Sequence, residues 1–175
     1  EEYLPQLLKL LKDKELKITF FIGGRWAEKN PELLMNIHND GHELGNHGYK
    51  HLYHSKLTPE GNRQEILKTE ETVKSITGCK TSLFAPPYGD LNNMVIETAE
   101  SLGYKVVLWS IDTIDWNTRD YNKILQRLEK KHHNGAIVLM HPTKVTIEAL
   151  PQMVATLEKY SYEITTVSDV IDSVQ

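Results

Sequence analysis

The stretch GHELGNHGYKHLYH, residues 41–54, organises this chain, because a short strand pattern runs there directly into a histidine-rich loop. It holds four of the chain's eight histidines. The pattern predicts a strand over residues 43–47 and a loop from Gly48 onward. Neutral imidazole is the commonest protein ligand for zinc and similar metals, so His47 and His51 are candidate metal ligands. The alternative is that both are surface or capping residues.

Two imidazoles do not complete a hydrolytic metal site, which needs about three protein ligands and an open position for water. The sequence leaves the third ligand open among carboxylates, namely Asp115, Asp90, Glu1 and Glu2. The histidines without such support are treated as structural or surface residues: His38, His42, His54, His132 and His133.

On either side of this stretch, helix patterns alternate with short apolar strand patterns. Asn30-Pro31 and Thr58-Pro59 are typical helix starts, with an N-cap residue followed by proline at the first helical position. The expected strands are residues 18–22, 43–47, 82–85, 105–109, 136–140 and 163–167. Residues 110–118 are predicted to be a polar loop.

The strict alternation of strands and helices predicts parallel strands joined by right-handed crossovers. Two α/β architectures fit this pattern, an open doubly wound sheet and a (β/α) barrel. No GxGxxG fingerprint or phosphate loop follows a predicted strand, which argues against nucleotide binding.

Composition sets further bounds. The 175 residues suit one domain, which we expect to span residues 1–175. The net charge of −4 and the lack of a basic run argue against nucleic acid as a partner, and no protein partner is indicated. A single cysteine, Cys79, excludes an internal disulfide and a multi-cysteine zinc site. Residue 1 is not methionine and a helix pattern begins at once, so we expect an N-terminal truncation that removes a first strand.

Polar and aromatic residues follow the carboxyl ends of several predicted strands. In parallel α/β folds these ends share one rim, where functional sites are built. The residues concerned are His47, His51, the turn at residues 86–90, Asp112, Asp115, Trp116 and His141. Their convergence predicts an enzyme.

Each of these residues also has a purely structural interpretation. His141 follows a very apolar strand, where a low dielectric can tune an imidazole for acid–base work. Asp115 and Trp116 could be a loop carboxylate and a core indole, and Asp112 could be a turn former. The turn PPYG at residues 86–89 is rigid in any case, and such a turn can aim a backbone N–H at a developing oxyanion.

With these residues in this order, the sequence resembles the polysaccharide deacetylases of the NodB-homology type, carbohydrate esterase family 4. The similarity lies in four segments: residues 19–51, FAPPYGD at 84–90, SIDTIDW at 110–116 and IVLMHPT at 137–143. The resemblance implies a distorted (β/α) barrel with parallel strands. It also implies metal-dependent removal of acetyl groups from N-acetylglucosamine units of peptidoglycan, chitin or a related polymer. The implied metal is zinc, with cobalt or nickel as alternatives, and the implied location is the cell envelope or outside the cell.

The resemblance also assigns roles to residues. His47 and His51 are implied to be two of three metal ligands. His141 is implied to be the general acid that protonates the leaving amine, with Asp115 orienting it. The backbone N–H of Tyr88 is implied to stabilise the oxyanion. The residues implied to line the substrate pocket are Pro87, Tyr88, Trp116 and Leu139.

Three departures from the family pattern stand out. A TFDDG-like opening motif, which supplies the family's catalytic base and third ligand, is not found in these 175 residues; it is expected either upstream of Glu1 or in a degenerate form. Ala85 stands where the family has an arginine, and Gly48 stands where it has a small hydroxyl residue. This combination resembles a divergent subgroup of spore-forming bacteria. Two alternatives therefore stay open: a catalytically impaired deacetylase fold that binds glycan without turnover, and an amidohydrolase acting on a small non-sugar amide.

Overall fold

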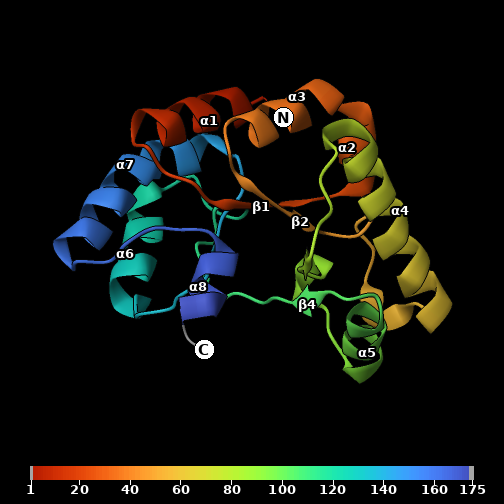
Figure 1. Cartoon of the computed structure of the whole chain (residues 1–175). Helices are drawn as coiled ribbons and strands as arrows, with labels where there is room; N and C mark the ends of the chain where they lie inside the picture. Colours follow the sequence, from red (N-terminus) through yellow and green to blue (C-terminus); the bar gives the residue numbers. More distant parts are fainter. Residues whose placement is uncertain (1, 174–175) are drawn as a thin grey trace. The chain divides into compact units, whose positions relative to one another are not determined.

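The computed structural model describes residues 2–173, and the chain divides into two compact units. One unit is the continuous segment Thr19–Leu108, and the other combines residues 1–18 with residues 109–175. Each unit has its own parallel sheet and its own buried apolar cluster, and Figure 1 labels the helices and some of the strands.

The Thr19–Leu108 unit is built on a four-stranded parallel sheet with the order β1-β2-β3-β4. Its strands are β1 (Thr19–Ile22), β2 (Glu43–Asn46), β3 (Leu83–Phe84) and β4 (Lys105–Val106). The β1–β2 register places Ile22 opposite Asn46 at the carboxyl end of both strands. The next residue along the chain is His47, so the sheet itself delivers the first candidate ligand to this edge.

Four helices accompany this sheet: α2 (Gly24–Lys29), α3 (Pro31–Asn39), α4 (Pro59–Thr77) and α5 (Asn93–Ser101). The long helix α4 packs against each of the other three (Figure 1). The Thr58 hydroxyl accepts a hydrogen bond from the Gly61 N–H, and Gly78, with a φ of 76°, ends the helix in the left-handed conformation. Both helix ends follow the expected signals. Two short 3₁₀ turns complete the unit, η1 (His54–Lys56) and η2 (Pro87–Gly89).

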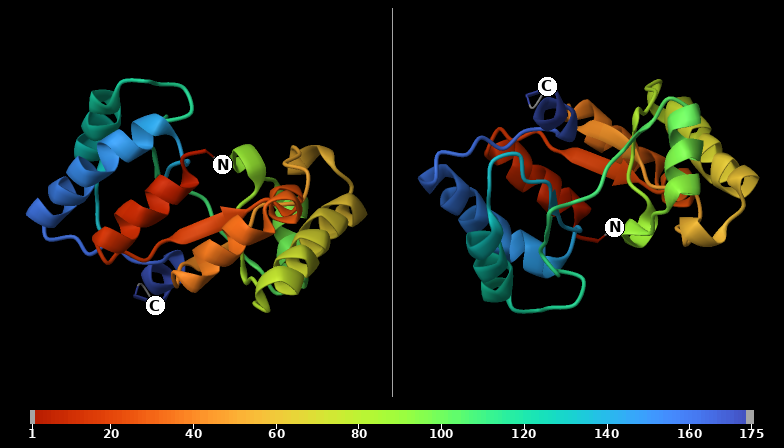
Figure 2. Two further views of the ribbon diagram at one scale, coloured as in Figure 1. Left: turned by 90° about the horizontal axis from the view of Figure 1, so that it is seen from above. Right: turned by 90° about the horizontal axis from the view of Figure 1, so that it is seen from below.

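The other unit contains α1 (Leu4–Asp13), α6 (Tyr121–Lys131), α7 (Lys144–Lys159), α8 (Val167–Ser173) and the strands β5 (Ile111–Asp112) and β6 (Val138–Leu139). The two strands pair in parallel, with Asp112 opposite Leu139. Helix α7 packs against both α1 and α6, as the views in Figure 2 show. The buried cluster beneath these helices includes Ile111, Leu128 and Met153.

Two expectations for this unit are wrong. Residues 163–166 form no strand, and helix α8 begins at Val167. The hydroxyls of Thr165 and Thr166 donate to the Asp169 carboxylate, and the Asp169 N–H donates back to Thr166. This capping arrangement stabilises a helix start and competes with strand pairing.

The second correction concerns residues 110–118, which are not a loop throughout. They contain β5, whose Ile111 is fully buried. The error has a simple cause, because two ladder residues among polar neighbours give no period-2 pattern. Three predicted strands are likewise shorter than expected, with only two ladder residues each in β3, β4 and β6.

Helix α2 follows directly after β1 and is not among the elements expected from the sequence. At the next helix start, Asn30 stands before Pro31 as expected, but its side chain makes no N-cap hydrogen bond. The Asn30 amide donates instead to the Trp26 carbonyl within α2. The α/β class with parallel strands is confirmed, and among residues 2–173 no helix is long and apolar enough to cross a bilayer.

Candidate metal ligands and acid–base pair

His47 leaves the sheet at the end of β2 with its backbone still in the ladder, because its N–H donates to the Ile22 carbonyl over 2.9 Å. Its Nδ1 lies 2.7 Å from the Ala85 carbonyl oxygen. A carbonyl oxygen only accepts, so Nδ1 must carry the ring proton. The lone pair therefore resides on Nε2, and fixing the tautomer through the second ring nitrogen is how metal-ligating histidines are commonly oriented.

A sharp turn brings His51 back beside His47. Gly48 and His51 both have left-handed backbones, with φ values of 71° and 58°. The two imidazole rings lie with their centroids 5.0 Å apart at an angle of 64°. The structure thus brings together the two histidines that the sequence singled out.

Gly48 owes its identity to close packing as well as to its positive φ. A Cβ added at this position would lie 2.7 Å from Nε2 of His54. His54 is fully buried, its Nδ1 is hydrogen-bonded to the Asn62 side chain, and burial lowers the pKa of its imidazole. The ring of His54 therefore occupies the space that a small hydroxyl side chain at position 48 would need.

Two polar side chains that sequence reasoning missed hold this turn. Glu65, on α4 and 8% exposed, accepts hydrogen bonds from the backbone N–H groups of Tyr49 and Lys50 over 2.9 and 2.6 Å. Asn46, fully buried, accepts from the Gly48 N–H over 2.9 Å. A signal was present for Glu65, because a carboxylate one helical turn before Thr69 interrupts the apolar face of α4.

The turn at residues 86–89 supplies Tyr88. Its backbone is left-handed, with a φ of 62°, and its side chain is 55% exposed. The ring meets His51 edge-on, with centroids 4.6 Å apart, while Pro87 is buried. A non-glycine residue in this conformation costs about 1–3 kcal/mol, so the surrounding packing must impose it.

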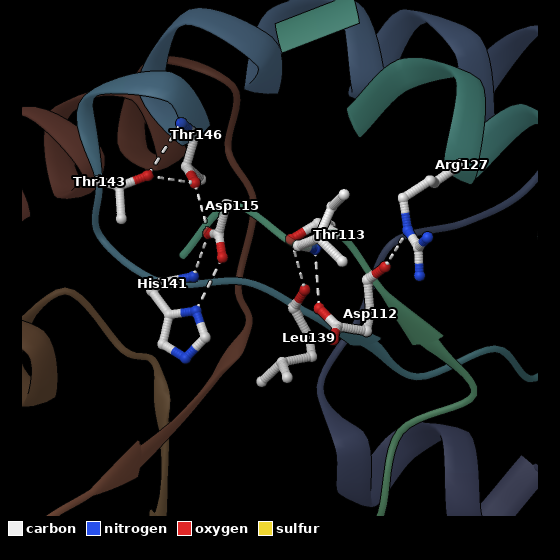
Figure 3. Close-up of polar contacts among 9 residues, drawn as sticks. Asp112, Thr113, Asp115, Arg127, Leu139, His141, Thr143 and Thr146 are labelled. Carbon is white, nitrogen blue, oxygen red and sulfur yellow. Dashed lines mark hydrogen bonds and ion pairs between the residues drawn. The ribbon is translucent and has the colours of Figure 1, made fainter. Parts of the chain in front are cut away.

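The other unit contains a buried carboxylate paired with an imidazole. The Asp115 side chain is 0% exposed and accepts from Nδ1 of His141 over 2.8 Å and from the His141 N–H over 2.5 Å. The His141 side chain remains 45% exposed, and its second ring nitrogen points away from Asp115 (Figure 3). The dyad thus has a buried orienting end and an accessible reacting end.

A third residue completes this pair and was also missed from the sequence. The Thr146 hydroxyl, near the start of α7, donates to Asp115 over 2.6 Å. Thr143 is the N-cap of the same helix, and its hydroxyl lies 2.9 Å from that of Thr146 (Figure 3). The segment of family similarity ends at Thr143, so it did not point to the Thr146 side chain.

These hydrogen bonds set the protonation states of the pair. The hydrogen bond that the His141 imidazole donates to Asp115 raises the pKa of His141 and outweighs the opposing effect of burial. Burial alone would raise the pKa of Asp115, but the hydrogen bonds from His141 and Thr146 outweigh it and lower that pKa. The arrangement favours an imidazolium beside a carboxylate, which is the protonated state that a general acid requires.

The remaining predicted residues of this unit have simpler settings. Asp112 accepts the Ile114 N–H over 2.7 Å, which is a turn-forming role. Leu139 is half-buried on β6, and its carbonyl accepts from both the backbone N–H and the hydroxyl of Thr113. Trp116 is 63% exposed, so its indole is not part of the core.

The third metal ligand is not found among residues 2–173, where no three histidine, cysteine or acidic side chains form a group that could hold a metal. Both oxygens of Asp90 accept hydrogen bonds from Ser55, and those of Asp115 serve His141 and Thr146. Glu2 belongs to no such group, and Glu1 lies outside the described residues. His47 and His51 therefore fit part of a metal coordination set.

Known proteins are similar to this chain in sequence and in fold. The polysaccharide deacetylase family matches residues 1–107. The chain is 38% identical to an uncharacterized protein, YlxY, of Bacillus subtilis (strain 168), covering 98% of this chain and 54% of that protein. It is 34% identical to a peptidoglycan-N-acetylglucosamine deacetylase of Bacillus cereus (strain ATCC 14579), covering 97% of this chain and 82% of that protein.

A solved structure agrees with these matches. The fold superposes with a TM-score of 0.94, at 37% identity, on a CE4 family pseudoenzyme from Bacillus anthracis, covering 97% of this chain and 60% of that one. The chain thus spans little more than half the length of some of its relatives. The similarity extends over nearly all of its own residues, and the chain belongs to the polysaccharide deacetylase family.

Proposed function

We propose that this chain carries the catalytic domain of a metal-dependent deacetylase that hydrolyses the acetamide of N-acetylglucosamine units in peptidoglycan or a chitin-like polymer. The observation that carries the proposal is the His141–Asp115 pair, with Nδ1 of His141 2.8 Å from a fully buried carboxylate. Amide hydrolysis expels a poor leaving group, an amine, which must be protonated as the C–N bond breaks. An oriented imidazolium with a raised pKa suits that step.

Each candidate site residue has a distinct role in the proposed reaction. His141 donates a proton to the departing nitrogen, and Asp115 holds the ring and stabilises its charged form. His47 and His51 provide imidazole ligands for a divalent metal, with zinc first and cobalt or nickel as alternatives. Such a metal would polarise the acetyl carbonyl and activate water. Tyr88 places a backbone N–H in a rigid turn suited to an oxyanion, and Pro87, Trp116 and Leu139 are proposed to contact the sugar.

A second candidate is a protein that binds glycan without turnover. Two observations favour it: Ala85 replaces the arginine of the family pattern, and a CE4 pseudoenzyme shares the fold at 37% identity. Ala85 is buried and offers its carbonyl to His47, but its methyl side chain can neither carry charge nor donate a hydrogen bond. A family-type catalytic base would therefore lack its usual partner. Either function places the protein in the cell envelope or outside the cell, where these polymers lie.

The deciding experiment measures acetate release from N-acetylated chito-oligomers and from peptidoglycan after addition of zinc, cobalt or nickel. We expect release that exceeds a His141→Ala control. Release no greater than this control, together with retained glycan binding, would establish the binding protein instead. Turnover of small amides with no preference for sugars would point to the third alternative, an amidohydrolase.

A further inference from the structure

Beside the candidate metal ligands, two tyrosine rings are stacked on one another at the surface. Tyr53 and Tyr88 are each 55% exposed, with ring centroids 4.3 Å apart and planes only 14° from parallel. Single exposed aromatic side chains are common, but paired rings that keep large exposed areas suggest a surface built for contact.

The stack continues into the histidine pair. Tyr88 meets His51 at 4.6 Å between centroids, and His51 meets His47 at 5.0 Å. We call the four residues His47, His51, Tyr88 and Tyr53 the aromatic row. Tyr53 forms its outer end, and its position two residues after His51 ties it to the ligand loop.

Neighbouring residues fix this arrangement. The Ser55 N–H and hydroxyl donate to the two oxygens of Asp90 over 2.7 and 2.8 Å, which joins the segment carrying Tyr53 to the turn carrying Tyr88. Between Tyr53 and Ser55, His54 is fully buried and its carbonyl accepts from the Asn62 amide over 3.0 Å. Tyr53 is therefore an exposed ring on an anchored backbone, which lowers the entropy cost of using it for binding.

The chemistry of this surface fits a neutral sugar ring. A pyranose presents a face of C–H groups that can cover an aromatic ring, while its hydroxyls reach the tyrosine O–H at the edge. Resting on the proposed function, we propose that Tyr53, backed by Tyr88, is a subsite for a pyranose ring next to the unit that is deacetylated. The subsite makes the protein select a glycan chain over a single N-acetylglucosamine.

The test measures binding of N-acetylglucosamine oligomers of increasing length to the full chain by calorimetry, separately from acetate release. Tyr53→Ala should weaken binding of long oligomers by about three- to tenfold, the scale of one aromatic contact, and leave the monomer unchanged. Tyr53→Phe should bind long oligomers more tightly than Tyr53→Ala, because the ring that covers the sugar face remains and only the hydroxyl contact is lost. Tyr160→Ala, which removes a tyrosine of similar exposure (42%) from the other unit, is the matched control and should bind as wild type.

Unchanged affinity of Tyr53→Ala for every oligomer would overturn the subsite. So would an equal loss for monomer and oligomer, since that would indicate damage to the ligand loop. Length-dependent binding that requires Tyr53, without acetate release, would uphold the subsite and refute the proposed hydrolysis. Acetate release with a length preference that survives Tyr53→Ala would uphold the proposed hydrolysis and refute the subsite.

Discussion

At the scale of single residues, the clearest feature is the asymmetry of the His141–Asp115 pair. The carboxylate is fully buried and the imidazole is 45% exposed, so one partner is fixed and the other can exchange protons with a ligand. The pKa of His141 is raised and that of Asp115 is lowered, each by the hydrogen bonds between them acting against burial. Replacing either residue should therefore shift the pKa of the other toward its ordinary value.

We predict that Asp115→Asn lowers the pKa of His141 toward its ordinary value and reduces turnover by about 10- to 100-fold. The sign follows from the two shifts: the contribution of His141 is complete below its ordinary pKa of about 6.5 and is lost as pH rises through the raised folded-state pKa. The contribution of Asp115 is complete above its ordinary pKa of about 3.8 and is lost as pH falls through the lowered folded-state pKa. The alkaline limb of the activity profile should move to lower pH. NMR titration of the His141 ring checks the shift, and an unaltered titration curve would contradict the role of Asp115.

Thr146 offers a finer test of the same pair. Thr146→Val keeps the shape of the side chain but removes the hydroxyl that donates to Asp115 over 2.6 Å. A buried carboxylate short of one hydrogen bond should cost about 1–3 kcal/mol of unfolding free energy. Urea denaturation measures this, and Thr146→Ser, which restores the hydroxyl, is the control. Equal stabilities for the valine and serine variants would argue against a positioning role.

For the Thr19–Leu108 unit, we predict that His47→Ala and His51→Ala each weaken metal affinity by more than about tenfold, since even partners that only orient a ligand contribute about 10–100-fold. His141→Ala should retain the metal, because its proposed task is protonation of the leaving group. Elemental analysis after dialysis gives the metal content. Wild-type metal content in both histidine variants would refute the ligand assignment.

At the scale of elements, α4 controls the loop that presents both candidate ligands. Glu65 accepts two backbone N–H groups from residues 49 and 50, so it caps this loop from a neighbouring helix. Hydrogen bonds to a charged acceptor are about twice as strong as those between neutral groups. The Glu65 carboxylate is therefore an important support for the loop.

We predict that Glu65→Gln destabilises the fold by about 1–3 kcal/mol and weakens metal binding, because the one carboxylate oxygen that accepts both N–H groups becomes an uncharged, weaker acceptor. Glu71→Gln, on the exposed side of the same helix, is the matched control and should have little effect. Thermal unfolding and a metal titration of both variants provide the measurement. If the two glutamine variants behave alike, loop support by Glu65 is excluded.

Elements also show where local sequence patterns succeed and fail. The helix pattern expected at the start of the chain is confirmed: Leu4, Leu7, Leu8 and Leu11 recur at i, i+3, i+4 and i+7 and are all buried on α1. The strand expected at 163–167 does not form, because Thr165, Thr166 and Asp169 make a helix start. Their capping hydrogen bonds outweigh the strand preference of the Thr and Val residues in this segment. Strand β5 was missed because its two ladder residues depend on pairing with β6, far along the chain.

At the scale of the whole molecule, the chain is two compact units that carry different parts of the proposed chemistry. The Thr19–Leu108 unit holds the aromatic row, and the other unit holds the acid–base pair. Both units belong to the region of family similarity, since the similarity to a peptidoglycan-N-acetylglucosamine deacetylase covers 97% of this chain.

The sequence by itself determined the parallel α/β class, most of the helices and the residue types of the candidate site, because these follow from local periodicity, caps and motif order. Tertiary structure alone decided the His47 tautomer, the space beside Gly48, the Thr146–Asp115 bond and the Tyr53 stack. The reason is physical. The bonds of His47 to Ala85, Thr146 to Asp115 and Ser55 to Asp90 join residues 38, 31 and 35 positions apart. Such contacts exist only once packing has brought the segments together.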